Sequence, residues 1–162
     1  MAEKEAVLGV IEVSELDPEF KYEIMKQPGG ENITRCFTCG TCPAGCPVTN
    51  VDCQYNPKRI IRMIVLGMRH EVLSSPLIWL CELCYRCSAH CPQQVNFTDI
   101  MRTLRYMAVK GNYVAPEILE KLEAVKKFSP TVRHDMIQAI FKSDTDPIPK
   151  IEDVLQELKK NG

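Results

Sequence analysis

The chain of 162 residues lacks the sequence features of several functional classes. Its formal net charge is −1 and its pI is about 6.3, whereas a nucleic-acid-binding domain usually carries a strong basic excess. The sequence contains no G-x-G-x-x-G fingerprint and no Walker loop, so it predicts no nucleotide site. It also shows no nucleophile beside a general base. We therefore expect no nucleic-acid partner and no active site of its own.

Long apolar segments are missing as well. The longest apolar stretch, 63–68, is far shorter than the roughly 20 residues that cross a bilayer. Met1 is followed by Ala-Glu-Lys-Glu, without the apolar core of a secretory leader. We therefore expect a cytoplasmic protein with no membrane span, in a reducing and anaerobic setting.

Cysteine, in contrast, is abundant and regularly spaced. Eight of the nine cysteines form two copies of the run Cys-x-x-Cys-x-x-Cys-x-x-x-Cys-Pro. The first run holds Cys36, Cys39, Cys42 and Cys46, and the second holds Cys81, Cys84, Cys87 and Cys91. This is the ligand spacing of proteins that bind two 4Fe–4S clusters, whose four iron corners each take one thiolate.

The fourth cysteine of each run is predicted to cross over. In two-cluster ferredoxins this cysteine ligates the cluster that the other run mainly holds. Cluster 1 is therefore assigned to Cys36, Cys39, Cys42 and Cys91, and cluster 2 to Cys81, Cys84, Cys87 and Cys46. The crossing would tie the two halves of the chain together and keep the clusters close enough for electron transfer.

Three other interpretations of the cysteines fit the sequence less well. Zinc usually takes four sulfurs in Cys-x-x-Cys pairs, so it would leave sulfurs of these runs unused. Disulfides need an oxidising compartment, and nine is an odd number. A thioredoxin-like redox pair would stand beside a βαβ pattern, which the sequence does not show.

The charges are unevenly distributed. Residues 32–110 carry nine Lys and Arg against four acids, a formal charge of +5, and the rest of the chain is acidic. Two oxidised clusters with their thiolates bring a charge of about −4, which this excess would nearly neutralise. A bland alternative is that each cation belongs to a solvated helix face.

The pattern predicts a mainly α protein with a pseudo-duplicated core. Asn56-Pro57 should begin a largely buried helix over 58–69, and Asn96 should begin a second one that Gly111 closes. A third helix is expected over 77–83, where it would carry Cys81 in its last turns. The two halves share residues at an offset of forty, including Asn56 with Asn96.

Extensions flank this core on both sides. We expect an acidic N-terminal extension over 1–31, the core over 32–111 and a helical C-terminal extension over 112–162. The first extension should hold a short strand over 7–13 and a helix up to about Lys26. The second should hold three amphipathic helices, over 117–127, 131–142 and 151–160.

Two segments resemble the C subunit of heterodisulfide reductase from methanogenic archaea. They are residues 36–48 (CFTCGTCPAGCPV) and 79–87 (WLCELCYRC), and the similarity extends from about Ile33 to Gly111. The resemblance implies an α-helical ferredoxin fold with two 4Fe–4S clusters and helical extensions. It also implies an electron-transfer subunit, without catalysis of its own, in a soluble oxidoreductase complex.

The resemblance further implies the partners. Electrons would come from a flavin-containing A subunit, fed by a hydrogenase or a formate dehydrogenase. They would pass to a B subunit that reduces the disulfide of coenzyme M and coenzyme B during methanogenesis. The alternatives are a freely diffusing two-cluster ferredoxin and the iron–sulfur subunit of another anaerobic enzyme, such as one similar to fumarate reductase.

Several single residues also carry expectations. Cys53, the ninth cysteine, is interpreted as a buried apolar thiol. His90 could donate to a cluster sulfur, although such a histidine is more often exposed. Trp79 is expected to anchor the core near the second cluster. Gly40 and Gly45 could let the loop approach a cluster closely, or serve an ordinary turn.

Overall fold

The computed structural model describes residues 12–142, and it divides the chain into two compact units. The first unit is Met1–Val114 and the second is Ala115–Gly162. Helices joined by loops and turns make up the described part, with no strand between residues 12 and 142. The prediction of a mainly helical protein is therefore confirmed. The domain boundaries after residues 31 and 111 stay predictions.

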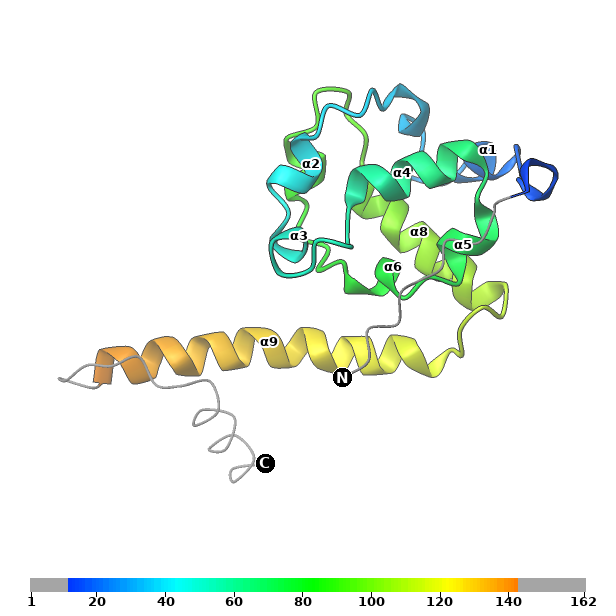
Figure 1. Cartoon of the computed structure of the whole chain (residues 1–162). Helices are drawn as coiled ribbons and strands as arrows, with labels where there is room; N and C mark the ends of the chain where they lie inside the picture. Colours follow the sequence, from blue (N-terminus) through cyan, green and yellow to red (C-terminus); the bar gives the residue numbers. More distant parts are fainter. Residues whose placement is uncertain (1–11, 143–162) are drawn as a thin grey trace. The chain divides into compact units, whose positions relative to one another are not determined.

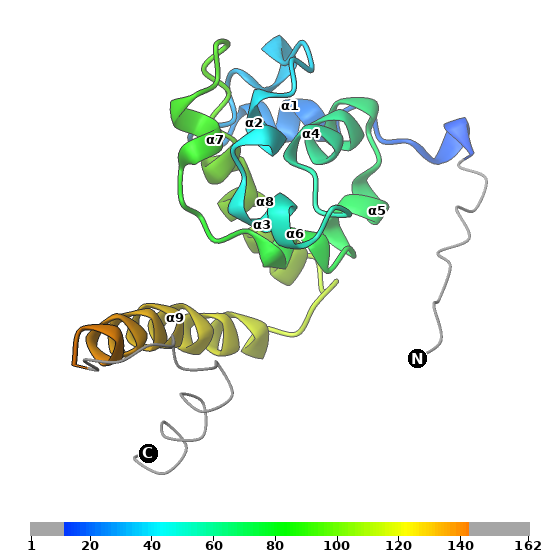
Figure 2. The ribbon, with the colours of Figure 1, turned by 60° about the vertical axis from the view of Figure 1, so that its left-hand side comes forward.

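The first unit is built around two longer helices, α4 (Pro57–Leu66) and α8 (Phe97–Lys110), with short helices around them (Figures 1 and 2). The short elements are η1 (Val13–Glu15), α1 (Phe20–Met25), η2 (Ile33–Arg35), α2 (Thr41–Ala44), α3 (Pro47–Val51), α5 (Arg69–Leu73), α6 (Leu77–Leu80) and α7 (Arg86–Ala89). Helix α4 contacts α1, α2 and α5, while α8 contacts α5, α6 and α7. Helix α2 also packs on α7, which brings the two cysteine runs together.

Helix α4 covers Pro57–Leu66 and begins as the sequence predicts. The Asn56 side chain accepts a hydrogen bond from the Arg59 N–H at 3.2 Å, which caps the helix, and proline occupies its first position. The predicted end at residue 69 is wrong, because Gly67 adopts a left-handed conformation (φ +84°) and ends the helix. A Cβ on Gly67 would lie 2.3 Å from the Asp17 carbonyl oxygen, so the N-terminal segment packs closely there.

Helix α8 covers Phe97–Lys110 and supplies much of the core. Its buried residues recur at helical spacing, and Gly111 follows its end as predicted. Asn96 precedes the helix, but its side chain makes no capping hydrogen bond. The buried core is formed by apolar residues from α1, α4, α5, α6 and α8 together with the segments between them: Phe20, Ile24, Ile33, Tyr55, Ile60, Ile61, Ile64, Val72, Leu73, Ile78, Val95, Phe97, Ile100, Met101, Leu104, Met107 and Ala108.

The two cysteine runs adopt the same backbone conformation. Residues 45 positions apart pair as follows: Cys36 with Cys81, Thr38 with Leu83, Gly40 with Tyr85, and Gly45 with His90. Thr38 and Leu83, for example, have φ angles of 59° and 56°. Gly40 precedes α2 at φ 88° and ψ −4°, and Tyr85 precedes α7 at φ 62° and ψ −1°. The repeated spacing of the cysteines thus corresponds to a repeated loop.

Two predicted elements of the first unit differ from the structure. The helix expected over 77–83 ends at Leu80, and Cys81 is extended, because Leu83 and Tyr85 take left-handed conformations that no helix accommodates. The strand expected over 7–13 falls mostly outside the described residues, and Val13 itself begins the 3₁₀ helix η1.

The second unit contains one described helix, α9 (Glu117–Lys142). The prediction of separate helices over 117–127 and 131–142 is wrong, because α9 continues through Pro130. Proline lacks the N–H that would bond to the carbonyl one turn earlier, and the Thr131 hydroxyl donates to the neighbouring Lys127 carbonyl at 3.1 Å. The helix expected over 151–160 lies outside the described residues.

Candidate metal centre

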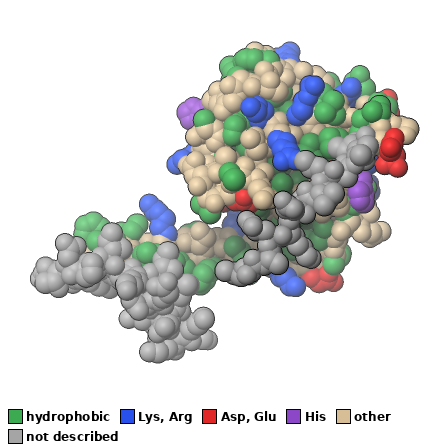
Figure 3. All heavy atoms as spheres, viewed as in Figure 1, with side chains coloured by type: hydrophobic (Ala, Val, Ile, Leu, Met, Phe, Trp, Pro, Cys, Tyr) green, Lys and Arg blue, Asp and Glu red, His purple; other side chains and the backbone are tan. Residues whose placement is uncertain are grey.

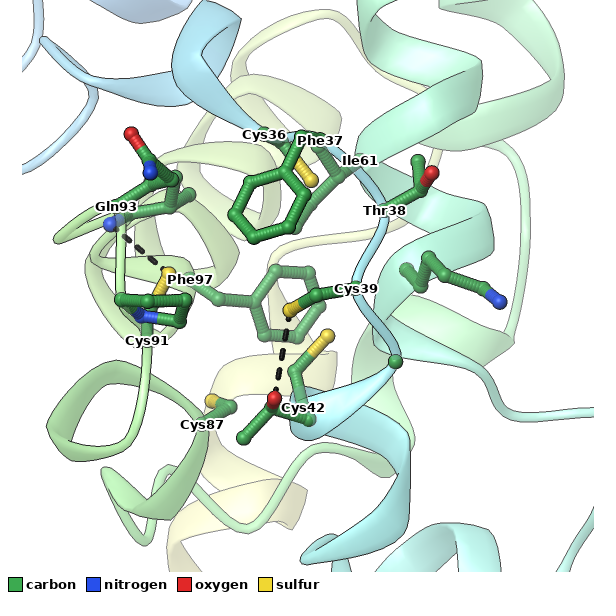
Figure 4. Close-up of a pocket in the computed structure, with 15 residues that line it drawn as sticks. Cys36, Phe37, Thr38, Cys39, Cys42, Ile61, Cys87, Cys91, Gln93 and Phe97 are labelled. Atoms are coloured by element: carbon green, nitrogen blue, oxygen red, sulfur yellow. Dashed lines mark hydrogen bonds between the residues drawn. The ribbon is translucent and has the colours of Figure 1, made fainter.

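A cavity of about 410 Å³ lies between the two cysteine runs. Its walls include Cys36, Cys39 and Cys42 from the first run and Cys87 and Cys91 from the second. Figure 4 shows these five side chains around one space, with Phe37, Ile61 and Phe97 beside them. We call this space the first cavity.

A second cavity of about 300 Å³ has a wall that mirrors the first. It is lined by Cys81, Cys84 and Cys87 from the second run and by Cys46 from the first. In each run, three cysteines thus line one cavity and the fourth lines the cavity of the other run. Cys87 lines both cavities, and so does the buried side chain of Phe97.

Exposure of the cysteines follows the same symmetry. Cys39 and Cys84, the second cysteine of each run, are exposed, while the other six ligand candidates are half-buried. Both cavities therefore open toward solvent at equivalent positions. Lys and Arg side chains lie on the upper part of the first unit in Figure 3. Helix α4 carries Lys58, Arg59 and Arg62 in its sequence.

The thiols of the first cavity interact electrostatically. Burial, together with the neighbouring Cys36 and Cys87 thiols, raises the pKa of Cys42 to about 12. The pKa of Cys39 is lowered, chiefly because its sulfur is hydrogen-bonded to the Thr41 hydroxyl at 3.3 Å. A cluster of thiolates that repel one another is a donor set that suits a cationic iron centre, since metal binding favours the deprotonated form.

Backbone groups also point at the sulfurs. The Val95 N–H donates to Cys91 Sγ at 3.3 Å, which Figure 4 draws as the dashed line at Cys91. The Leu83 N–H donates to Cys81 Sγ at 3.4 Å. Hydrogen bonds to sulfur are one of the means by which a protein sets the reduction potential of an iron–sulfur cluster. One such bond reaches a cysteine of each cavity.

The second cavity has further polar neighbours that the sequence did not indicate. The side chain of Tyr55, only 1% exposed, lines the second cavity together with Cys81, and burial together with the nearby Cys81 thiol raises the pKa of its hydroxyl. Arg105 donates to the carbonyl oxygens of Ile78, Trp79 and Cys81 at 2.9, 3.1 and 2.6 Å. Burial lowers the pKa of Arg105, and the charge of Cys81 opposes that shift.

Thr98 belongs to the same environment. It is the buried polar residue of the described core, and its hydroxyl accepts a hydrogen bond from Ser88 Oγ at 3.2 Å. Its Oγ1 also lies 3.6 Å from Cys87 Sγ. Thr98 and Arg105 both stand on the apolar stripe of α8, with Met101 and Ala108 at helical spacing. Polar residues on such a stripe were the signal that could have revealed them.

The remaining candidate residues are placed as follows. Cys53 is exposed, so the prediction of a buried apolar thiol is wrong; it lies in the turn after α3. His90 is exposed at the end of α7, and its possible role toward a cluster stays a prediction. Trp79 is partly buried against the core, as expected, and stacks with Arg105 at 5.7 Å. Gly40 has a positive φ with open space around it, whereas Gly45 has ordinary angles.

Comparison with known proteins agrees with these cysteine-lined cavities. The family model described as "4Fe-4S dicluster domain" matches residues 32–95. A Methanococcus maripaludis protein, named as the C2 subunit of an H(2)/formate:CoB-CoM heterodisulfide,ferredoxin reductase, is 30% identical over 168 residues. That match covers 94% of this chain and 90% of the relative. The chain belongs to the family of heterodisulfide reductase C subunits. The predicted family is therefore confirmed.

Other members of this family vary in length. A Methanosarcina mazei protein, named as the C subunit of a ferredoxin:CoB-CoM heterodisulfide reductase, is 33% identical over 145 residues, which cover 85% of this chain and 89% of the relative. A Methanothermobacter thermautotrophicus protein, named as the C subunit of an H(2):CoB-CoM heterodisulfide,ferredoxin reductase, is 36% identical over 107 residues. That match covers 66% of this chain but only 57% of the relative, so the chain spans little more than half of that protein's length.

The described part of the chain holds neither a site for a single metal ion nor a membrane-spanning helix. Within residues 12–142, no three Cys, His, Asp or Glu side chains are placed to bind one ion, as distinct from the larger cluster that each cysteine-lined cavity suits. None of the helices described there is both long enough and apolar enough to cross a membrane.

Proposed function

We propose that the chain is the iron–sulfur subunit of a heterodisulfide reductase complex and relays single electrons through two 4Fe–4S clusters. The observation that carries the proposal is the pair of cavities lined by cysteines of both runs. When bound, such a cluster accepts and releases one electron at a time. Membership of the family of C subunits and the match to a 4Fe–4S dicluster domain support the proposal.

The proposed ligand sets are the crossed ones. Cys36, Cys39, Cys42 and Cys91 would hold cluster 1, and their presence on the wall of the first cavity supports this assignment. Cys81, Cys84, Cys87 and Cys46 would hold cluster 2, and they line the second cavity. Cys87 also borders the first cavity, but its two neighbours in the loop, Cys81 and Cys84, border only the second.

The chain's own residues would hold and shield the clusters rather than act on a substrate. Ile61, Val95 and Phe97 give the first cavity an apolar wall, and Phe97 also borders the second. In the proposed complex, a flavin-containing A subunit supplies electrons and a B subunit reduces the disulfide of coenzyme M and coenzyme B. The relatives named for hydrogen- or formate-dependent reductases support this setting.

Anaerobic purification with metal analysis tests the cofactor. We expect about eight iron and eight sulfide per chain, which is two clusters of four each, together with the visible and electron paramagnetic resonance spectra of 4Fe–4S clusters. Stoichiometric zinc without sulfide would overturn the cofactor assignment.

Purification of the native chain from its own cells tests the complex. We expect the chain to elute from gel filtration in a larger assembly with a flavoprotein and a disulfide-reducing protein. A cluster-loaded monomer whose clusters are still rapidly reduced and reoxidised would instead indicate a freely diffusing ferredoxin.

A further inference from the structure

The two cavities differ in the charges around their cysteines: Lys58 lines the first, whereas Arg86 and Glu82, of opposite sign, line the second and Arg105 lies behind it. The Arg105 guanidinium lies behind the second cavity and donates to the carbonyl oxygen of Cys81 itself at 2.6 Å. It is half-buried, and its cation faces the ring of Trp79 at 5.7 Å. Three hydrogen bonds to carbonyl oxygens fix its position. A positive charge fixed in a low-dielectric site acts strongly on a nearby change of charge.

The polar groups near the sulfurs of the second cavity are more deeply buried. Cys81 Sγ accepts a hydrogen bond from the Leu83 N–H, and the Tyr55 side chain lines the same cavity wall as Cys81. Cys87 Sγ lies 3.6 Å from the Thr98 hydroxyl, which already accepts from Ser88 and so has its own hydrogen free to donate. Tyr55 and Thr98 are buried, so solvent does not compete for these groups.

The first cavity has a weaker set of such groups among the described residues. Its sulfur contacts are the Val95 N–H to Cys91 and the exposed Thr41 hydroxyl to Cys39. The cation on its wall is Lys58, which is half-buried as Arg105 is, but its ammonium stands on a flexible stem. The Arg105 guanidinium is instead held in one place by three carbonyl oxygens.

We propose that Arg105 and Tyr55 raise the reduction potential of cluster 2 above that of cluster 1, so that an electron entering the pair settles beside Cys81. Reduction adds one negative charge, which the guanidinium and the hydroxyl stabilise. The transfer oxidises cluster 1 and reduces cluster 2 by one electron, and it moves no proton and no covalent bond. The inference rests on the proposed function, since it requires both clusters.

A redox titration of the full, cluster-loaded chain tests the inference. Electron paramagnetic resonance would follow both one-electron potentials in the wild type and in Arg105→Met. We expect the higher potential to fall, so that the equilibrium between the two clusters shifts about tenfold, which is about 59 mV for one electron. The lower potential should change less, so the gap between the two potentials narrows.

Two milder variants keep the inference testable if Arg105→Met fails to fold. Tyr55→Phe keeps the ring and removes only the buried hydroxyl on the cavity wall. It should lower the higher potential enough to change the equilibrium constant between the two clusters by about threefold, the effect of one polar group. Arg105→Lys keeps the charge but loses the planar fork, and it should move the higher potential less than Arg105→Met does.

Matched controls separate this role from general effects. Lys110→Met removes one cation from the exposed end of the same helix, and Tyr113→Phe removes one hydroxyl from the edge of the core. Both should leave the gap unchanged. Three results would overturn the inference. The first is an equal shift of the higher potential in the controls. The second is a wider gap between the two potentials in Arg105→Met, and the third is an unchanged gap in both Arg105→Met and Tyr55→Phe. Absence of iron and sulfide from the wild type would instead overturn the proposed function.

Discussion

The loops over 36–46 and 81–91 have nearly the same backbone but different surroundings. Both pass through two left-handed residues into a short helix, and both expose their second cysteine. Behind the second loop lie Arg105, Tyr55 and Thr98, whereas apolar side chains and Lys58 line the cavity of the first. The ligand geometry therefore belongs to the repeated motif, and the electrostatic environment belongs to the rest of the fold.

The left-handed residue before each short helix shows the same division. Gly40 takes this conformation without strain, but Tyr85 takes it as a non-glycine residue, at a cost of roughly 1–2 kcal/mol. Tyr85 in turn donates to Asp99 at 3.1 Å and stacks under Arg102 at 5.5 Å. Contacts with α8 thus hold the second loop in a conformation that glycine provides in the first.

The crossed assignment gives the largest expected effect. Cys46→Ala should remove the cluster of the second cavity and leave the first, and Cys91→Ala should do the reverse, because each cysteine lines the cavity of the other run. Iron content should fall by about half in each variant. Electron paramagnetic resonance would identify the surviving cluster by comparison with Cys39→Ala and Cys84→Ala. Loss of the cluster adjacent in sequence would contradict the assignment.

Removal of a buried hydroxyl should have the next largest effect. Thr98→Val keeps the shape but removes the acceptor of the Ser88 hydroxyl hydrogen, although Ser88 Oγ still accepts from the backbone N–H of residue 98. It should lower the free energy of unfolding by about 2 kcal/mol. Thr41→Val changes the exposed hydroxyl of the first loop and should cost less than about 0.5 kcal/mol. Anaerobic denaturant titration of the two cluster-loaded variants measures the difference. Equal losses of unfolding free energy in the two variants would mean that the hydroxyl beside each loop stabilises the fold equally.

Substitution of the left-handed residue before each short helix should change the free energy of unfolding less. Gly40→Ala meets no atom within 4 Å, so the positive φ alone should destabilise it, by about 1 kcal/mol. Tyr85→Gly relieves that strain but loses the contacts with Asp99 and Arg102, so we expect a change within about 0.5 kcal/mol of zero. Denaturant titration compares both with the wild type. If Tyr85→Gly lost more unfolding free energy than Gly40→Ala, the contacts of Tyr85 with α8 would outweigh the strain of its left-handed conformation.

The smallest expected effect concerns a site away from both loops. Hydrogen bonding to Arg69 lowers the pKa of Asp17 below 3.8, so this pair stabilises the fold above about pH 4 and loses that contribution as pH falls through the lowered pKa. Both side chains are about one-third exposed, so Asp17→Asn should remove less than about 1 kcal/mol at pH 7. Unfolding measured from pH 7 down through the lowered pKa of Asp17, below pH 3.8, should show a shallower loss of stability in the variant. Both cluster potentials should stay unchanged, and a shift in either would mean that the loops sense this distant charge.

Local signals in the sequence predicted much of the fold. The cysteine spacing predicted the thiols that line the two cavities, and Asn56-Pro57 and Gly111 marked ends of α4 and α8. The end of α4 at Gly67 was missed because apolar residues continue past it, although the close approach of Asp17 makes glycine necessary there. Continuation of α9 through Pro130 could not be read from a residue that usually ends helices.

The surroundings of the site were harder to predict. Arg105 looked like one more cation of a basic segment, because its three carbonyl partners belong to residues 78–81, about 25 positions earlier. Tyr55 gave no local signal, since its contact with Cys81 also joins distant parts of the chain. Cys53 was expected inside because thiols usually are, but the turn after α3 leaves it exposed.

The wall that Cys87 and Phe97 contribute to both cavities has a consequence for electron counting. With so little protein between them, two added electrons would repel each other, and uptake would be anticooperative. Each midpoint would then describe the coupled pair rather than one centre. A substitution such as Phe97→Leu, which changes neither ligands nor charges, should alter the spacing between the two midpoints by changing how strongly one centre senses the other.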